Sequence, residues 1–446
     1  MSALFVYGLF LFGCLAGVAR PWIGLIMFYV FVVLEPTWNW RWAIDPYFPY
    51  QKYIAGSVVC GFALTGFRRA STITSVKWGI VGILGFLGIA YLSAFQSINK
   101  EYSYQYMDFL WKIVLMALLT IWTIDTPKKI MTLAWVVVLC SGYNAYQINL
   151  QYFQDGYSVY ARSAWGVKGD NNLYSIFTLP VMAIAISLCV YGKQLWHRGL
   201  AGFIFLLQMH MLMLLESRGS MIGGLFLGCV FAYLVPKTPR VWMAMGGSIL
   251  AGMLLAGPSV VKEFSSAFES SETRDSSASS RFEVWHAGMV ITEQHPLLGV
   301  GPNAGRFLVP AFVPSETRDQ KALHNLFFEI STGCGLPATL CYFTFFGLVW
   351  WQNFRQRRLL KRGAPDWVSM TILSVGCGIP GYMLASMFSS GALLESSYLL
   401  VAFGAVGLST YTRYQTEPTK AEPPSFGINP ANAFVVSTSA AGVDAR

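Results

Sequence analysis

Long apolar segments alternate with short polar ones along almost the whole chain. Each apolar segment comes close to the roughly 20 residues that an α-helix needs to cross about 30 Å of hydrocarbon. The pattern predicts about thirteen transmembrane helices, at residues 3–19, 22–36, 53–66, 78–97, 109–124, 130–148, 173–191, 199–215, 220–236, 241–257, 324–352, 367–388 and 393–411. We therefore expect an all-α polytopic membrane protein with about 12–13 such helices and one long extracytoplasmic loop that contains short helices.

These spans divide the chain into four parts. Residues 1–257 form an N-terminal set of about ten transmembrane helices, and residues 258–323 form the long extracytoplasmic loop. Residues 324–411 form the C-terminal transmembrane helices. The tail at 412–446 is rich in Pro, Ala and Ser, which is typical of disordered chain, and we expect it in the cytoplasm.

The orientation follows from the basic residues of the short loops, because such loops face the cytoplasm. The basic clusters are Arg68, Arg69 and Lys77; Lys128 and Lys129; Lys193 and Arg198; Lys237 and Arg240; and Arg355, Arg357, Arg358, Lys361 and Arg362. The extracytoplasmic segments are then 37–52, 98–108, 149–172, the turn at 216–219 and the stretch 258–323. The orientation of the first two apolar segments stays open.

Composition agrees with a membrane environment and narrows the partners. Hydrophobic residues make up 54% of the chain and charged residues 12%, against a charged share of about 25% in ordinary soluble domains. The formal net charge of +9 resides mostly in the short loops that set the orientation. Membrane lipids with anionic headgroups are therefore the expected partner of these charges, and nucleic acid is not.

Three ionisable residues fall on the extracytoplasmic side, next to long apolar segments. Arg218 lies in a turn between two apolar runs, where an arginine needs water, a partner or a phosphate. Arg281 opens a predicted helix of the long loop, and His324 begins a span. Each has a plain alternative: Arg218 pairs with Glu216 at the interface, Arg281 is solvated, and His324 is structural. Their occurrence on one side, which the loop charges define independently, favours a shared site.

The long loop also contains a helix signal and a glycine-rich turn. Ser280 and Glu283 have capping-box spacing. Three apolar residues share one face of this helix, as in an interfacial helix that lies on the membrane domain: Phe282, Trp285 and Met289. Residues 299–305 resemble a phosphate-binding glycine loop, but no strand precedes them, so we interpret them as a turn that closes the helix.

Four polar residues lie on the same side, in the loop before the span at 173–191: Arg162, Lys168, Asp170 and Asn171. A solvated loop and a contribution to the site both remain open for these four residues.

Several short motifs in this region resemble the O-antigen ligase superfamily, which includes O-antigen polymerases and bacterial protein O-oligosaccharyltransferases. The motifs are Ser217-Arg218-Gly219-Ser220; Arg281 with Trp285; residues 295–301; Gly169-Asp170-Asn171-Asn172; and His324-Asn325-Leu326-Phe327-Phe328-Glu329 with Gly333 and Gly335. The opening, Arg20-Pro21-Trp22-Ile23-Gly24, resembles O-glycosylation ligases found beside exosortase systems. The resemblance covers most of the chain and is most specific between Asp170 and Gly335.

The resemblance implies a metal-independent membrane glycosyltransferase whose donor is a polyprenyl diphosphate-linked glycan, such as one on undecaprenyl diphosphate. It implies no cofactor. We predict that His324, Arg218 and Arg281 are the catalytic residues, and that the substrate-binding residues are Arg162, Lys168, Asp170, Asn171, Asn325 and Glu329. Guanidinium groups bind phosphate oxygens bidentately, and an imidazole of pKa about 6.5 suits removal of a proton from a hydroxyl. The outward-facing acids show no pair at metal-ligand spacing, so no metal site is predicted.

Three readings of function remain. The first is a ligase that transfers a preassembled glycan to an acceptor hydroxyl of lipid A core, protein or exported polymer, on the periplasmic face of the bacterial inner membrane. The second is a polymerase, whose acceptor is another lipid-linked glycan. The third is a transporter or flippase for lipid-linked glycans, which typically has midplane charges and repeats. Here few charges lie in the predicted spans, among them Lys112, Glu329 and Glu395, and no repeat is found, which favours an enzyme.

Overall fold

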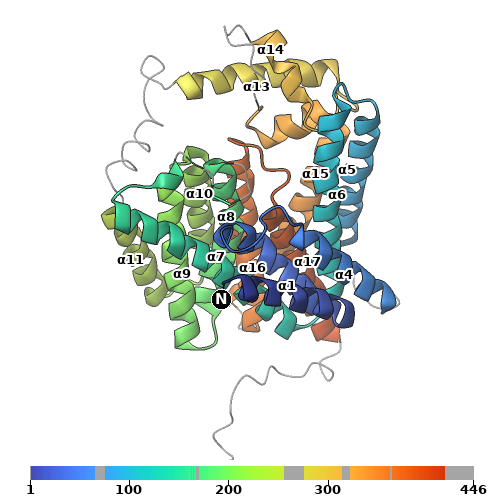
Figure 1. Ribbon diagram of the computed structural model, residues 1–446. Coiled ribbons are helices and arrows are strands. Elements are labelled where there is room, and N and C mark those ends of the chain that lie inside the picture. The colour runs from blue at the N-terminus through green and yellow to red at the C-terminus, as the bar shows by residue number, and fades with distance from the viewer. Residues whose placement is uncertain are drawn as a thin grey trace, which may run out of the picture.

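The structure is a computed structural model that describes residues 2–65, 76–161, 163, 165–166, 170–255, 276–313, 322–361 and 364–416. In these residues all regular secondary structure is helical (Figure 1). The predicted all-α polytopic class is therefore confirmed. The tail predicted to be disordered lies outside the described residues from position 417 onward.

Each predicted span corresponds to one helix. These helices are α1 (Ser2–Ala19), α2 (Pro21–Val33), α4 (Tyr50–Leu64), α5 (Lys77–Phe95), α6 (Lys100–Thr123), α7 (Pro127–Asp155), α8 (Asn171–Tyr191), α9 (Leu195–Leu214), α10 (Arg218–Leu234), α11 (Pro239–Leu255), α15 (Leu326–Arg355), α16 (Asp366–Ser386) and α17 (Glu395–Thr416). The shorter elements are α3 (Pro36–Asn39), η3 (Val159–Ala161), α13 (Ser276–Gln294), η4 (Gly305–Phe307), α14 (Val309–Phe312) and η5 (Gln356–Lys361).

Six helices in the described part of the chain are long and apolar enough to cross a membrane: α1, α5, α6, α8, α15 and α16. Helices α2 and α10 are apolar but shorter. The protein is thus a multi-pass membrane protein by the length and composition of its helices. The number of about thirteen crossings stays a prediction.

Two helices extend beyond the apolar segments that predicted them. Helix α6 begins at Lys100 rather than at residue 109, because the Asn99 side chain caps it by accepting a hydrogen bond from the Tyr102 amide at 3.2 Å. Helix α7 continues to Asp155 instead of ending at residue 148. With 24 and 29 residues, these helices measure about 36 and 44 Å. Both are longer than the roughly 30 Å of hydrocarbon.

The C-terminal helices form the centre of the bundle. Helix α16 packs against α8 and α10, and α17 packs against α6 and α16. Small residues allow the close crossing of α10 and α16, because a Cβ atom on Gly223 would lie 2.6 Å from the Cβ atom of Ala385. This crossing fixes the beginning of α10, and with it Arg218, beside the segment 387–394 that joins α16 to α17.

Helix α13 lies across one end of the bundle with η4 and α14 (Figure 1). It begins at Ser276 rather than at the predicted Ser280. Its packed face carries Val284, Ala287 and Ile291, which form a second, smaller core with Val300, Ala304, Val309 and Leu323. Two residues of the apolar face identified from the sequence are exposed instead: Phe282 at 57% and Met289 at 51%.

A break in α15 anchors the turn that follows α13. Gly335 has φ 82° and ψ 172°, so the helix is interrupted there, and carbonyl groups before the break are free to accept other donors. The carbonyl of Thr332 accepts from the Val300 amide at 2.8 Å, and that of Gly333 accepts from the Gly301 amide at 2.9 Å. The glycine-rich segment 299–305 is therefore a structural turn, as its sequence indicates, and it is bound to α15 by main-chain hydrogen bonds.

The Gly335→Ala substitution is expected to destabilise the protein by about 2 to 4 kcal/mol. The left-handed φ of 82° is unfavourable for alanine, and the added Cβ would overlap the Leu297 carbonyl oxygen. The midpoint of thermal unfolding in detergent measures the effect. Gly347→Ala in the same helix is the control, because a Cβ there meets no atom within 4 Å. Equal midpoints for the two variants would contradict the anchoring role of the break.

Candidate functional site

The N-termini of α8, α10 and α15 meet at the end of the bundle that α13 covers. The Asn171 amide group at the start of α8 donates to the Leu215 carbonyl just before α10, at 2.8 Å. The Asn325 amide group before α15 donates to the Met387 carbonyl at 3.0 Å. The first bond joins the starts of α8 and α10, and the second joins the start of α15 to the end of α16, whose next residue, Phe388, packs against Gly219 in α10. Helix N-termini carry partial positive charge, which favours anions beside the starts of these helices.

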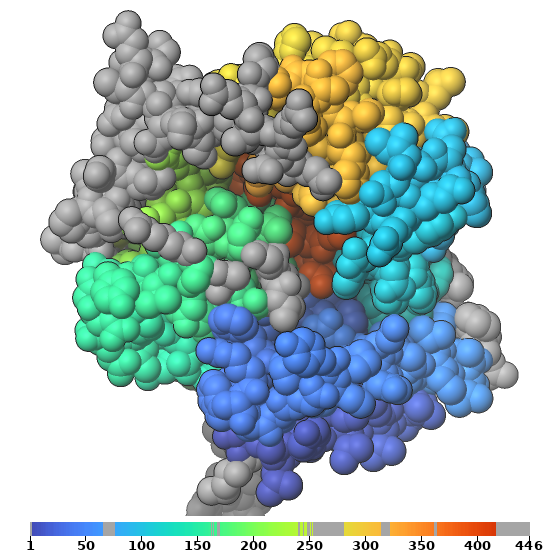
Figure 2. Space-filling view, turned by 45° about the horizontal axis from the view of Figure 1, so that its top comes forward, coloured from blue at the N-terminus to red at the C-terminus, as the bar shows by residue number. Residues whose placement is uncertain are grey.

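A hollow opens on this face of the molecule. Figure 2 shows it between the cyan segment of α6 and the green segments of α7 and α8, with orange-red residues of the C-terminal part at its floor.

Three of the predicted substrate-binding residues have structural roles at the helix N-termini. Asp170 caps α8, because its carboxylate accepts from the Leu173 amide at 2.7 Å. Asn325 caps α15 by accepting from the amides of the second and third residues after it, at 2.9 and 3.2 Å. Asn171 donates to the carbonyls of Ala161 and Leu215. These hydrogen bonds position the helices and use part of the capacity of each side chain.

Arg218 is the first residue of α10 and is half-buried. The glycine that follows it is required by packing, because a Cβ on Gly219 would lie 2.6 Å from the Cβ of Phe388. This contact places the start of α10 against segment 387–394. The Ser-Arg-Gly-Ser motif thus combines a cation with the small residue that allows its helix to approach α16.

Arg281 lies on α13 and is half-buried. Because α13 begins at Ser276, Arg281 lies in the helix interior, and the prediction that it opens this helix is wrong. Burial lowers the pKa of Arg281, the positive charge of Arg218 lowers it further, and the negative charge of Asp170 opposes both effects. Two guanidinium groups and one carboxylate are therefore close enough to interact electrostatically.

His324 lies directly before the cap of α15, with a left-handed φ of 46°. Burial lowers the pKa of His324 from its usual 6.5, and the charges of Arg281 and Arg306 lower it further, while Asp170 raises it. The imidazole is therefore neutral at neutral pH. The structure thus brings Arg218, Arg281 and His324 to one region, with Asp170 as the acid beside them.

The titration of His324 is expected to occur below pH 6.5 in the folded protein. The Arg281→Gln substitution should raise this pKa, because it removes a positive charge that disfavours the imidazolium. The measurement is the rate of diethyl pyrocarbonate modification of the His324 peptide against pH, followed by mass spectrometry. The exposed His286 provides an internal reference. A midpoint at or above 6.5, or no upward change in the variant, would contradict this electrostatic environment.

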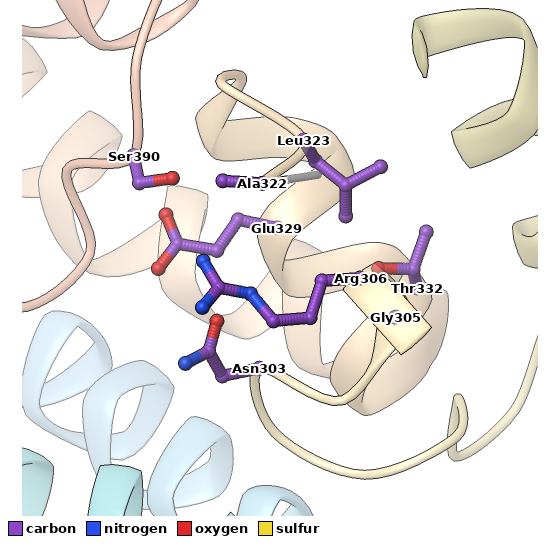
Figure 3. A pocket seen from close by; sticks show the side chains of 8 residues that line it. All are labelled: Asn303, Gly305, Arg306, Ala322, Leu323, Glu329, Thr332 and Ser390. Carbon is purple, nitrogen blue, oxygen red and sulfur yellow. The ribbon is translucent and has the colours of Figure 1, made fainter. Parts of the chain in front are cut away.

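Glu329 lies in the first turn of α15 and points into a pocket beside the site (Figure 3). One carboxylate oxygen accepts from the Tyr106 hydroxyl at 3.5 Å, and the other accepts from the Gly391 amide at 3.2 Å. The pocket is lined by Asn303, Gly305, Arg306, Ala322, Leu323, Glu329, Thr332 and Ser390.

Sequence reasoning missed Arg306, which lies across this pocket from Glu329 (Figure 3). Arg306 belongs to η4, directly after the glycine-rich turn at 299–305. In the sequence, Arg306 is a single basic residue of the predicted extracytoplasmic loop, a few residues after the motif at 295–301 that resembles the O-antigen ligase superfamily. The fold was needed to show that the turn brings this residue to the start of α15.

Two predicted substrate-binding residues, Arg162 and Lys168, lie outside the described residues. Their roles stay predictions. Where the structure describes the chain, no group of three or more His, Cys, Asp or Glu side chains is arranged to hold a metal ion.

The fold and the gathered residues define a class of protein: a polytopic helical membrane protein with a cationic site at one end of its helices. Residues 201–343 match the family model described as O-antigen ligase, and this match supports the resemblance of the chain to the O-antigen ligase superfamily. The matched segment includes Arg218, Arg281, His324, Arg306 and Glu329. Residues 1–194 match a family of unknown function (DUF5935). No curated protein matches the chain.

Proposed function

We propose that this membrane protein is a glycan ligase, which transfers a preassembled glycan from a polyprenyl diphosphate carrier to a hydroxyl group of an acceptor. The acceptor is lipid A core, a protein or an exported polymer. The proposed location is the inner membrane of a bacterium, with the site facing the periplasm. The match of residues 201–343 to the O-antigen ligase family model supports an enzyme over a transporter.

The observation that carries the proposal is the proximity of Arg218 and His324, at the starts of α10 and α15, to Arg281 on α13. Burial and, after it, the positive charge of Arg218 lower the pKa of Arg281, while the charge of Asp170 raises it. Such an arrangement costs free energy in the unliganded protein and favours a ligand of high negative charge. A diphosphate with two or more charges satisfies this requirement, and the same groups would stabilise the charge that develops as it leaves.

The neutral imidazole of His324 supplies the proton acceptor. A base must be uncharged before it accepts a proton, and the lowered pKa of His324 keeps it so at neutral pH. In the proposed reaction His324 takes the proton of the acceptor hydroxyl. The hydroxyl oxygen forms a bond to the anomeric carbon of the glycan as the bond from that carbon to the diphosphate breaks. The electron pair of the broken bond leaves with the polyprenyl diphosphate.

The test is a transfer reaction with purified protein, a labelled lipid-linked glycan and candidate acceptors. The expected result is a labelled acceptor together with released polyprenyl diphosphate in equal amount. Label on core lipid, protein or polymer identifies a ligase, whereas label on a second lipid-linked glycan identifies a polymerase. Movement of the intact lipid-linked glycan across a vesicle membrane, without cleavage, would identify a flippase and refute the proposal.

A further inference from the structure

Glu35 is a buried acid of the N-terminal half that takes no part in the proposed reaction. It lies at the junction between α2 and α3, is fully buried, and has a left-handed φ of 49°. Left-handed backbone is uncommon for glutamate, and burial of a carboxyl group costs free energy. The side chain directly precedes α3 but does not cap that helix. This unfavourable placement therefore points to a requirement elsewhere in the fold.

The backbone on both sides of Glu35 is fixed to α7 by side-chain amides. The Asn39 amide group donates to the Leu34 carbonyl at 2.5 Å and to the side-chain oxygen of Asn144 at 2.9 Å. The Asn144 amide group donates to the Val33 carbonyl at 2.7 Å. Because these bonds flank Glu35, they hold the segment that carries its side chain.

The Glu35 carboxyl group lies against Gly166, in the loop between α7 and α8. A Cβ on Gly166 would overlap the Oε2 atom of Glu35, so only glycine allows this approach. Trp165, which precedes this glycine, is 3% exposed. Its ring packs between Trp38 of α3 and Tyr174 of α8, with centroids 6.0 and 6.1 Å away. The junction of α2 and α3 therefore contacts both the loop and the first turns of α8.

These contacts lie next to Asp170, the acid of the candidate site. Asp170 caps α8, and Tyr174 follows it by about one helical turn. Besides burial, the groups that set the pKa of His324 are Arg281, Asp170 and Arg306. A change at Glu35 would thus reach His324 by moving Asp170.

We propose that Glu35 is a positioning residue, whose carboxyl group holds Trp165 and Gly166 against α8 so that Asp170 lies beside Arg281 and His324. Glu35 contacts no reacting group in this scheme. It gives a role to part of residues 1–194, which match a family of unknown function. The consequence for catalysis rests on the proposed glycosyl transfer, whereas the placement of Asp170 does not.

The test follows the protonation midpoint of His324 in the purified full-length protein, without substrate. The readout is the rate of diethyl pyrocarbonate modification of the His324 peptide against pH. Asp170→Asn provides the reference, because asparagine keeps the helix cap and removes the negative charge. The midpoint should fall in this variant, since the charge of Asp170 raises the pKa of His324.

Two further variants break the contact of Glu35 with Gly166 from opposite sides. Glu35→Asn shortens the side chain with a residue that tolerates left-handed backbone. Gly166→Ala places a methyl group against the carboxyl group and keeps every charge, so its effect reports position. Each should lower the midpoint of His324. Each combined with Asp170→Asn should give the midpoint of Asp170→Asn alone, because both act through the same carboxylate.

Gly156→Ala is the matched control for the backbone. Gly156 precedes the same loop with a similar φ of 75°, but a Cβ there meets no atom within 4 Å. Glu101→Asn, on α6, controls for the loss of an exposed acid. Both should keep the midpoint of the unmodified protein. Thermal unfolding midpoints and size-exclusion profiles verify the fold of every variant.

The outcomes separate this inference from the proposed function. Unchanged midpoints in both contact variants would overturn the role of Glu35. So would a further fall when Asp170→Asn is added, or an equal change in Gly156→Ala. A lowered midpoint supports the role of Glu35 even if the protein transfers no glycan. Where transfer occurs, the acidic limb of its pH profile should move with the His324 midpoint, and an unmoved limb would overturn the link to catalysis.

Discussion

Replacing His324 by alanine reduces glycan transfer by about 10² to 10⁴-fold, the usual contribution of a general base. The substitution removes an uncharged proton acceptor that directly precedes the cap of α15 and lies near Arg281. Initial rates of product formation at saturating donor and acceptor measure the effect. Binding of the lipid-linked donor should persist, because the arginine cluster is unchanged.

The backbone at His324 requires a second variant. Its φ of 46° is unfavourable for alanine, whereas asparagine tolerates left-handed backbone well and lacks a comparable base. His324→Asn should therefore keep the thermal stability of the unmodified protein and still lose transfer. The exposed His286 on α13 is the matched control. Turnover retained by the asparagine variant would remove His324 from the mechanism.

Replacing Arg281 by glutamine reduces transfer by about 10² to 10³-fold, as loss of a charge-stabilising donor does in other enzymes. Because burial and the charge of Arg218 both lower the pKa of Arg281, removing its charge relieves an unfavourable interaction in the unliganded protein. The unfolding temperature should therefore stay constant or rise while activity falls. Affinity for undecaprenyl diphosphate, measured by competition with the donor, should fall in parallel.

The lysine variant separates charge from geometry at this position. Arg281→Lys retains the charge but lacks the planar fork that binds two phosphate oxygens, so it should restore only part of the activity. Arg41→Gln, which changes an exposed arginine beside Trp38, should leave transfer unchanged. A glutamine variant that loses stability but keeps diphosphate affinity would assign Arg281 a structural role and refute its proposed one.

The helical architecture could be predicted from the sequence because long apolar segments, which suit hydrocarbon, alternate clearly with short polar segments, which suit water. An apolar segment has to become a helix in lipid to satisfy its own backbone. The first and last residues of the helices were harder to predict, since hydropathy does not show which side chains cap a helix. Asn99 extends α6 outward by capping it at Lys100, where the chain is already polar.

Residues of the candidate site could be predicted from the sequence only where the membrane topology places them on one side of the bilayer. Arg218, Arg281 and His324 were identified because a charge on one side of a membrane has few neighbours. Glu329 was named as a ligand, but its contacts with Tyr106 and Gly391 join segments far apart in the chain, and no spacing rule reveals them. Asp170, Asn171 and Asn325 were assigned to substrate, although their sequence context also fits helix caps.

The main-chain hydrogen bonds between the glycine-rich turn and the break in α15 limit which residues of this protein can change in evolution. These hydrogen bonds run from amide to carbonyl, so they do not depend on which side chains flank them. Mutation can alter exposed side chains there, such as Leu297, as long as the glycines remain at 299, 301, 333 and 335. Remote kin of this protein should therefore be recognisable by glycine spacing long after pairwise identity has faded.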